Sequence, residues 1–96
     1  MAGPWEQAMD YWQQRIVTGR DGEKHTAVRI CKTGTDDARR YEWDPAWAGR
    51  WTAVAWEPGI ENTLWIKDLP DEAAAKAHCD AWLADPAGGG RWYRTA

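Results

Sequence analysis

Four Ile, three Val and three Leu are the only large aliphatic residues in a chain of 96, which also contains no phenylalanine and no serine. The absence of serine excludes a serine nucleophile. No apolar run approaches the roughly 18 residues of a membrane-spanning helix, so no membrane association is predicted. The chain starts without a basic region followed by an apolar run, which predicts that it carries no secretory signal.

Cysteine and histidine are equally scarce, with two of each. Cys31 and Cys79 are too few for a disulfide framework, and without an export signal they are predicted to be reduced thiols of a cytoplasmic protein. The cysteines, His25 and His78 show neither C-x-x-C nor H-x-x-x-H spacing, so no metal site is predicted. There is no glycine-rich phosphate-binding motif. The sequence therefore predicts a protein that is not an enzyme and has no catalytic residue, metal or other cofactor.

Tryptophan is what the chain has in excess: nine Trp accompany three Tyr, and alanine takes sixteen positions. A chain of this length forms one domain near the low end of the usual size range. Tryptophan has to replace the missing Phe and Leu in the core, because few other large side chains are present. Nine tryptophans are hard to bury in so small a body, so several are expected at the surface.

Helices are predicted at both ends of the domain. Over residues 4–16, Pro4 suits the first helical position, and apolar residues such as Trp5 and Trp12 lie on one stripe at helical spacing. Residues 71–84 are rich in alanine, the best helix former, and follow Asp68 as the predicted N-cap.

Between these helices, alternation of apolar and polar residues predicts strands at 24–32, 39–43, 51–57 and 62–67. Strands joined by short turns pair antiparallel. The predicted fold is therefore α+β, with an antiparallel three- or four-stranded sheet flanked by an N-terminal and a C-terminal helix. Residues 1–86 are predicted to be a single domain, and residues 87–96 a glycine-rich linker with a short aromatic and basic tail.

The order helix, strands, helix over Pro4–Ala84 resembles that of the double-stranded RNA-binding domain. The resemblance implies phosphate binding by lysines at the start of the last helix, where this chain has Asp68, Asp71 and Glu72. A net charge of −3 also predicts weak non-specific binding to phosphates. A nucleic-acid-binding module is the alternative function, and it would use a basic and aromatic strip that includes Arg29.

Protein binding is the favoured function, because exposed Trp and Tyr beside Arg are typical of interface hot spots. Such residues gather around the second predicted strand and the loop that follows it, where a core has no use for them. The arginines are expected to steer and orient the partner, and the tryptophans to anchor it. The predicted partner-binding residues are Arg39, Arg40, Tyr41, Trp43, Trp47, Arg50 and Trp51.

A tryptophan-bearing hairpin at residues 49–56 is followed by the strand Thr-Leu-Trp-Ile-Lys and the helix start Asp-Leu-Pro-Asp-Glu-Ala-Ala-Ala-Lys. This pattern, over residues 49–84, resembles short orphan proteins of phages and other mobile elements in GC-rich bacteria. The resemblance implies a host protein or protein complex as partner, steric inhibition of a host-defence complex as in anti-CRISPR proteins, and a location in the bacterial cytoplasm. The sequence leaves homodimerisation open.

Overall fold

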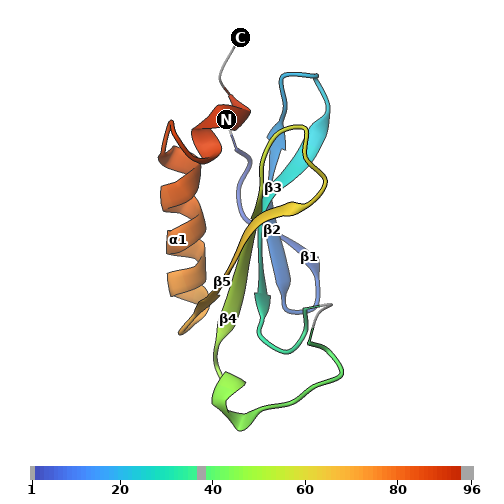
Figure 1. The fold of residues 1–96 in the computed structure, drawn as a ribbon, viewed down its shortest axis with the longest axis vertical. Coiled ribbons are helices and arrows are strands. Elements are labelled where there is room, and N and C mark those ends of the chain that lie inside the picture. Colours follow the sequence, from blue (N-terminus) through green and yellow to red (C-terminus); the bar gives the residue numbers. More distant parts are fainter. Residues whose placement is uncertain (1, 37–38, 94–96) are drawn as a thin grey trace.

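The computed structural model describes residues 2–36 and 39–93, and these form a five-stranded antiparallel sheet with one α-helix against it (Figure 1). The strand order follows the chain order, so every strand pairs with the next one along the sequence. The strands are β1 (Glu6–Met9), β2 (Trp12–Thr18), β3 (Lys24–Lys32), β4 (Trp51–Trp56) and β5 (Thr63–Leu69); the helix is α1 (Glu72–Ala84), and two 3₁₀ turns are η1 (Pro45–Trp47) and η2 (Gly89–Trp92).

The predicted fold class is wrong at the N-terminus, because residues 4–16 form β1 and most of β2 instead of a helix. Tyr11 makes the turn between these strands with a left-handed φ of 62°. The side of β2 that faces α1 is mostly polar: Gln13 hydrogen-bonds Glu72, the Arg15 Nη1 lies 2.9 Å from Asp80 Oδ1, and only Val17 is buried in the core. A strand with polar side chains on its inner face lacks the alternation that identifies strands, so the helical spacing of its apolar residues was misleading.

The strand predicted at 39–43 is also absent, since residues 39–43 lie in the long connection between β3 and β4 without strand pairing. The other three predicted strands are confirmed as β3, β4 and β5 with small shifts of their ends. The C-terminal helix is confirmed as α1. Its N-cap is Asp71, whose carboxylate accepts a 2.7 Å hydrogen bond from the Ala74 N–H, and not Asp68.

The core lies between α1 and one face of the sheet. Small side chains on β4, Ala53 and Ala55, are fully buried and let the helix approach closely. Cys79 and Leu83 pack on them from the helix. Larger rings close the margin of this core: the partly buried Trp5, Trp51, Trp56, Trp65 and Trp82 all pack against it.

The segment predicted as a linker and tail packs against the body between residues 88 and 93. Gly88 and Gly89 are buried, and a Cβ atom on Gly89 would lie 2.7 Å from the Leu83 Cα. Trp92 is 4 % exposed, and its indole N–H donates a 3.1 Å hydrogen bond to the Trp56 carbonyl. Three glycines therefore allow a close turn over the end of α1, while residues 94–96 lie outside the described part of the chain.

Candidate functional site

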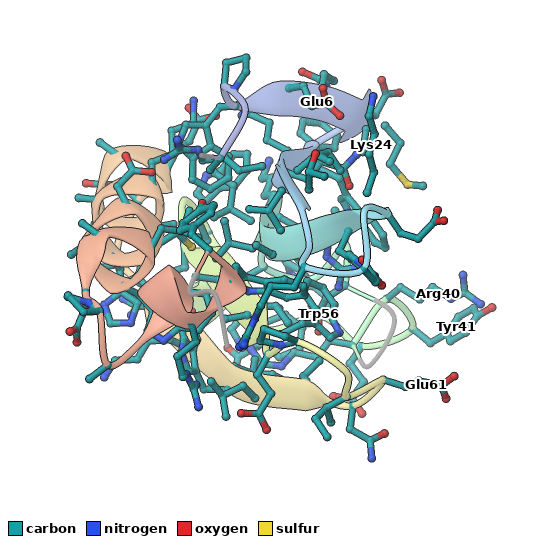
Figure 2. All side chains as sticks on the ribbon, turned by 90° about the horizontal axis from the view of Figure 1, so that it is seen from above. Glu6, Lys24, Arg40, Tyr41, Trp56 and Glu61 are labelled. Carbon is teal, nitrogen blue, oxygen red and sulfur yellow. The ribbon has the colours of Figure 1, made fainter. Side chains whose placement is uncertain are left out.

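The candidate site is the face of the sheet opposite α1. Side chains alternate between the faces of a strand, and the contacts of Gln13 and Arg15 with α1 identify the helix-covered side. No α-helix of the described residues covers the opposite face, but the β3–β4 connection lies against one end of it, where Cys31 and Thr52 are fully buried and the Thr35 carbonyl accepts a hydrogen bond from Trp12. Figure 2 shows α1 on one side of the curved sheet and the labelled Arg40 and Tyr41 on the other. We call this surface the open face; it carries Trp12, Gln14, Thr26, Arg29, Val54, Trp56, Leu64 and Ile66.

Arg29 lies at the centre of the open face, where it is paired with Gln14 on β2 and Val54 on β4. Its guanidinium carbon is 4.2 Å from the ring centroid of Trp12 and 5.6 Å from that of Trp56. Cations attract the π-face of an indole ring at these distances. Arg29 is thus held between two tryptophans that come from different strands.

The charge of Arg29 has no counter-ion within the described residues. The guanidinium of Arg29 forms no ion pair or hydrogen bond with residues 2–36 or 39–93, and its buried Nε has no hydrogen-bond partner. A buried polar atom without a partner costs about 1–3 kcal/mol. The Trp12 ring is itself fixed by a 3.2 Å hydrogen bond from its N–H to the Thr35 carbonyl. The two rings therefore present a positively charged group to the outside without neutralising it.

Exposed aliphatic side chains lie beside this group on β5. Ile66, which is 59 % exposed, is paired with the buried Val54, and Leu64 is also exposed. Ile60 is exposed in the connection between β4 and β5. The open face therefore combines aromatic, aliphatic and cationic groups on one surface.

A hollow of about 440 Å³ adjoins the open face at Trp56. Two glutamates, Glu57 and Glu61, belong to its wall; Glu57 is paired with Arg91 at 3.2 Å, while Glu61 points away from the body in Figure 2. The lining consists of His25, Thr26, Trp56, Glu57, Gly59, Ile60, Glu61 and Trp92.

The residues predicted from the sequence as a partner surface are only partly brought together. Tyr41 and Trp43 are strongly exposed, and the guanidinium of Arg40 stacks on Tyr41 at 4.9 Å from its ring centroid. Arg39 lies 5.5 Å from the ring of Trp47, which is half-buried. The loop beyond the end of the sheet is formed by the residues of these two contacts together with Trp43: Arg39, Arg40, Tyr41, Trp43 and Trp47.

Arg50 and Trp51 are engaged by the fold instead. The Nε of Arg50 lies 2.9 Å from the Asp68 carboxylate on β5, and Trp51 packs against the core. They hold the base of the loop to the sheet.

Sequence reasoning missed the Trp12–Arg29–Trp56 arrangement. It placed Trp12 in a helix, and it used Arg29 only for the nucleic-acid alternative. The available signal was the arginine between Val28 and Ile30 in a half-buried strand, since a charged residue there must face away from the core.

Burial and hydrogen bonding shift the pKa of several titratable groups in the described residues. Burial raises the pKa of the Cys79 thiol to about 12, with a smaller effect from Asp80, so it stays protonated near neutral pH. Burial also raises the pKa of Tyr93. The pKa of Asp21 is lowered by the backbone N–H of Glu23 and then by the ring of His25. No group of three or more His, Cys, Asp or Glu that could hold a metal occurs in residues 2–36 and 39–93.

No protein-family model, curated protein or solved structure matches this chain. Within the described residues, no helix has the length and apolar character needed to cross a membrane.

Proposed function

We propose that this protein is a non-enzymatic protein-binding module and that the open face is its binding surface. The observation that carries the proposal is the guanidinium of Arg29, which Trp12 and Trp56 hold in place without a counter-ion in the described residues. An arginine fixed by aromatic rings is pre-organised to bind a carboxylate through parallel N–H bonds. The expected partner therefore places an acidic side chain at Arg29.

The surroundings of Arg29 favour a protein partner. Ile66 and Leu64 offer aliphatic area for apolar side chains of a partner, and the hollow beside Trp56 can receive one side chain. Trp and Arg are the residue types that dominate interface hot spots, where truncation of one side chain costs about 2 kcal/mol or more. The exposed Tyr41 and Trp43 provide a second contact area beyond the sheet.

Binding of single-stranded nucleic acid is the second candidate, since tryptophan rings beside an arginine also stack bases and bind phosphates. Three observations weigh against it. The net charge is −3, and the acidic residues Glu6, Glu57 and Glu61 lie around the same face. Aliphatic residues such as Ile66 also provide no π-surface for a base.

Within the favoured function, we propose the narrower role implied by the resemblance to phage proteins: occlusion of a host-defence complex in the bacterial cytoplasm. Cys31 and Cys79 are both buried thiols, which fits a reducing compartment. A rigid sheet face that covers a partner's working surface needs no catalytic group of its own.

The test is capture from a nuclease-treated bacterial lysate with immobilised wild type, Arg29→Met and the control Arg20→Met. Arg20 is also an arginine but lies in the exposed turn before β3, away from the open face. We expect the same protein to be captured by the wild type and by Arg20→Met, and to be lost with Arg29→Met. Salt tolerance of the captured complex is expected, because apolar contacts are not screened.

Equal capture by Arg29→Met and the wild type would show that the open face is not the binding surface. Capture that disappears on nuclease treatment and falls steeply with salt would instead identify the nucleic-acid function. A Trp43→Ala variant in the same assay separates the loop from the open face: we expect partial loss if the loop is a second contact area.

A further inference from the structure

The outer edge of β5 is the longest unpaired strand edge in the described part of the chain. β5 has seven residues and is the last strand of the sheet, so it pairs only with β4. No backbone hydrogen bond outside the β4–β5 ladder involves a described residue of β5. The other edge strand, β1, has four residues and an irregular register between Gln7 and Met9. An exposed edge with free N–H and C=O groups is a template for another strand.

We propose that β5 is a dimerisation edge and that its partner is β5 of a second copy of this chain, paired antiparallel across a two-fold axis at Ile66. The proposal concerns the sheet edge and not Arg29, and the two proposed surfaces share only the aliphatic side chains Ile66 and Leu64 at their border. Two copies related in this way would share a continuous ten-stranded sheet, with both helices on the same side.

The alternation of side chains restricts the register. Directly opposed residues of an antiparallel pair point to the same face, so a two-fold axis must pass through one residue position of β5. An axis at Lys67 would oppose two ammonium groups. An axis at Trp65 would oppose two indole rings that already contact His78 and Trp82 of α1 at 4.9 and 5.8 Å between ring centroids.

An axis at Ile66 avoids both conflicts. Ile66 is the midpoint of β5, and this register keeps Trp65, Ile66 and Lys67 within the stretch of regular pairing. It places Lys67, which has no ion-pair partner in the described residues, opposite Trp65 of the second copy, where a cation–π contact is favourable. The β-bulge that makes Leu64 the extra residue of β5 limits regular pairing to the stretch that begins at Trp65.

The open face is apolar on both sides of this axis. Ile66 is 59 % exposed, Leu64 is exposed beside it, and both lie next to the buried Val54. Pairing of two β5 strands would bring Ile66 against its own copy and cover part of this aliphatic surface. Cross-strand pairs of this kind stabilise a sheet in addition to its backbone hydrogen bonds.

The helices do not prevent this arrangement. α1 packs mainly over β4 and β3 and less over β5, which it meets at Trp65. Two β4 strands separated by two β5 strands are about 14 Å apart, which exceeds the roughly 10–12 Å diameter of a helix with its side chains.

The test is analytical ultracentrifugation over a concentration series for the wild type, Ile66→Lys, Ile66→Glu and the control Ile60→Lys. Ile60 is 51 % exposed like Ile66 but lies before β5, so it receives the same change outside the paired edge. We expect a concentration-dependent dimer for the wild type and for Ile60→Lys, and at least tenfold weaker association for each Ile66 variant alone. Circular dichroism checks that all four proteins are folded.

An equimolar mixture of Ile66→Lys and Ile66→Glu is the decisive measurement. In the proposed register the new lysine of one copy lies directly opposite the new glutamate of the other. We expect the mixture to recover a dimer that neither variant forms alone. A wild type that stays monomeric at every concentration would overturn the proposal. So would equal weakening by Ile60→Lys and Ile66→Lys, or a mixture that remains monomeric. The capture assay with Arg29→Met is read separately, so either proposal can fail without the other.

Discussion

Arg29 combines a structural cost with a binding opportunity. Its Nε is buried without a hydrogen bond, and no carboxylate of the described residues neutralises its charge. The rings of Trp12 and Trp56 offset part of this cost through cation–π attraction. If Arg29 serves only the fold, an apolar side chain of similar length can replace it without loss of function. If Arg29 binds a partner, the same replacement abolishes binding.

This difference predicts opposite effects of Arg29→Met on stability and on binding. Methionine keeps an unbranched stem between the two rings and removes the unpaired Nε, so we expect the free energy of unfolding to stay within about 1 kcal/mol of the wild type. Urea denaturation followed by tryptophan fluorescence measures it. A loss of more than about 2 kcal/mol would assign Arg29 to the fold and remove the main support for the open face as a binding surface.

Cys79 makes a pH-dependent contribution to the free energy of unfolding, and a comparison with Cys79→Ala can isolate it. Burial raises the thiol pKa to about 12 in the folded protein from the ordinary 9.0. The unfolded thiol ionises first as pH rises, so stabilisation from this group is complete below pH 9.0 and is lost progressively toward pH 12. We expect the stability difference between wild type and Cys79→Ala to shrink by on the order of 1 kcal/mol between about pH 8 and pH 10.

Subtracting the free energy of unfolding of Cys79→Ala from that of the wild type cancels the titration of lysines and tyrosines, because both proteins share these residues. Denaturation by urea at each pH gives the two free energies. A constant difference across this range would mean that the thiol ionises as easily in the folded state as in the unfolded one. The same burial predicts that thiol reagents modify Cys79 slowly until the protein is unfolded.

At the scale of elements, the sequence was a reliable guide where one side of a strand or helix is uniformly apolar. β3 and β4 place Val28, Ile30, Ala53 and Ala55 in the core, and their alternation identified both strands. The same reasoning failed at β2, since Gln13 and Arg15 face α1 and are satisfied there by acidic residues of the helix. Such a polar contact depends on two distant segments, so no local pattern can reveal it.

The candidate site shows the same division between local and distant information. Trp43, which the sequence places beside a loop, is strongly exposed, and so is Tyr41. The stacking of Arg29 between Trp12 and Trp56 required the register of three strands, including one that had been predicted as a helix. Composition indicated that surface tryptophans exist, but only the pairing of strands determines which of them share a face.

The C-terminal turn η2 depends on glycine at positions of close approach. A Cβ on Gly89 would lie 2.7 Å from the Leu83 Cα and 2.8 Å from the Trp82 ring. We therefore expect Gly89→Ala to lower the free energy of unfolding by about 1–3 kcal/mol, because the backbone of η2 must move away from α1. Urea denaturation of Gly89→Ala is compared with that of Gly3→Ala, whose new Cβ would meet only the Ile16 carbonyl at an ordinary 3.5 Å.

Equal stability of these two alanine variants would contradict the packing of η2 on α1. It would restore the interpretation of the glycines as a flexible connection that tolerates any small residue. The comparison is matched, since each variant adds one methyl group to the chain.

For the molecule as a whole, the nine tryptophans divide into distinct roles. Trp5, Trp51, Trp65 and Trp82 border the core, and Trp12 and Trp56 hold Arg29. In the β3–β4 connection, Trp43 is exposed and Trp47 is half-buried beside Arg39. Trp92 is the most buried of the nine tryptophans, with 4 % of its surface exposed. It connects three parts of the fold, because its ring lies 5.4 Å from that of His25 and its N–H is bonded to the Trp56 carbonyl. The last described residues therefore close the body of a domain whose core is otherwise built from small side chains.

This arrangement predicts unequal effects of removing two indole rings. Trp92→Ala should lower the free energy of unfolding by about 3–5 kcal/mol, a large part of the total for a small domain, whereas Trp43→Ala should change it by less than about 0.5 kcal/mol. Trp92→Phe keeps an aromatic ring and removes the N–H, so we expect it to lower the free energy of unfolding by less than Trp92→Ala does. This smaller loss can be measured even if Trp92→Ala does not fold. Urea denaturation of the three variants gives the ranking Trp92→Ala, Trp92→Phe, Trp43→Ala from most to least destabilised. If Trp92→Ala were as stable as Trp43→Ala, the C-terminal segment would be an appendage and the core would have to be complete without it.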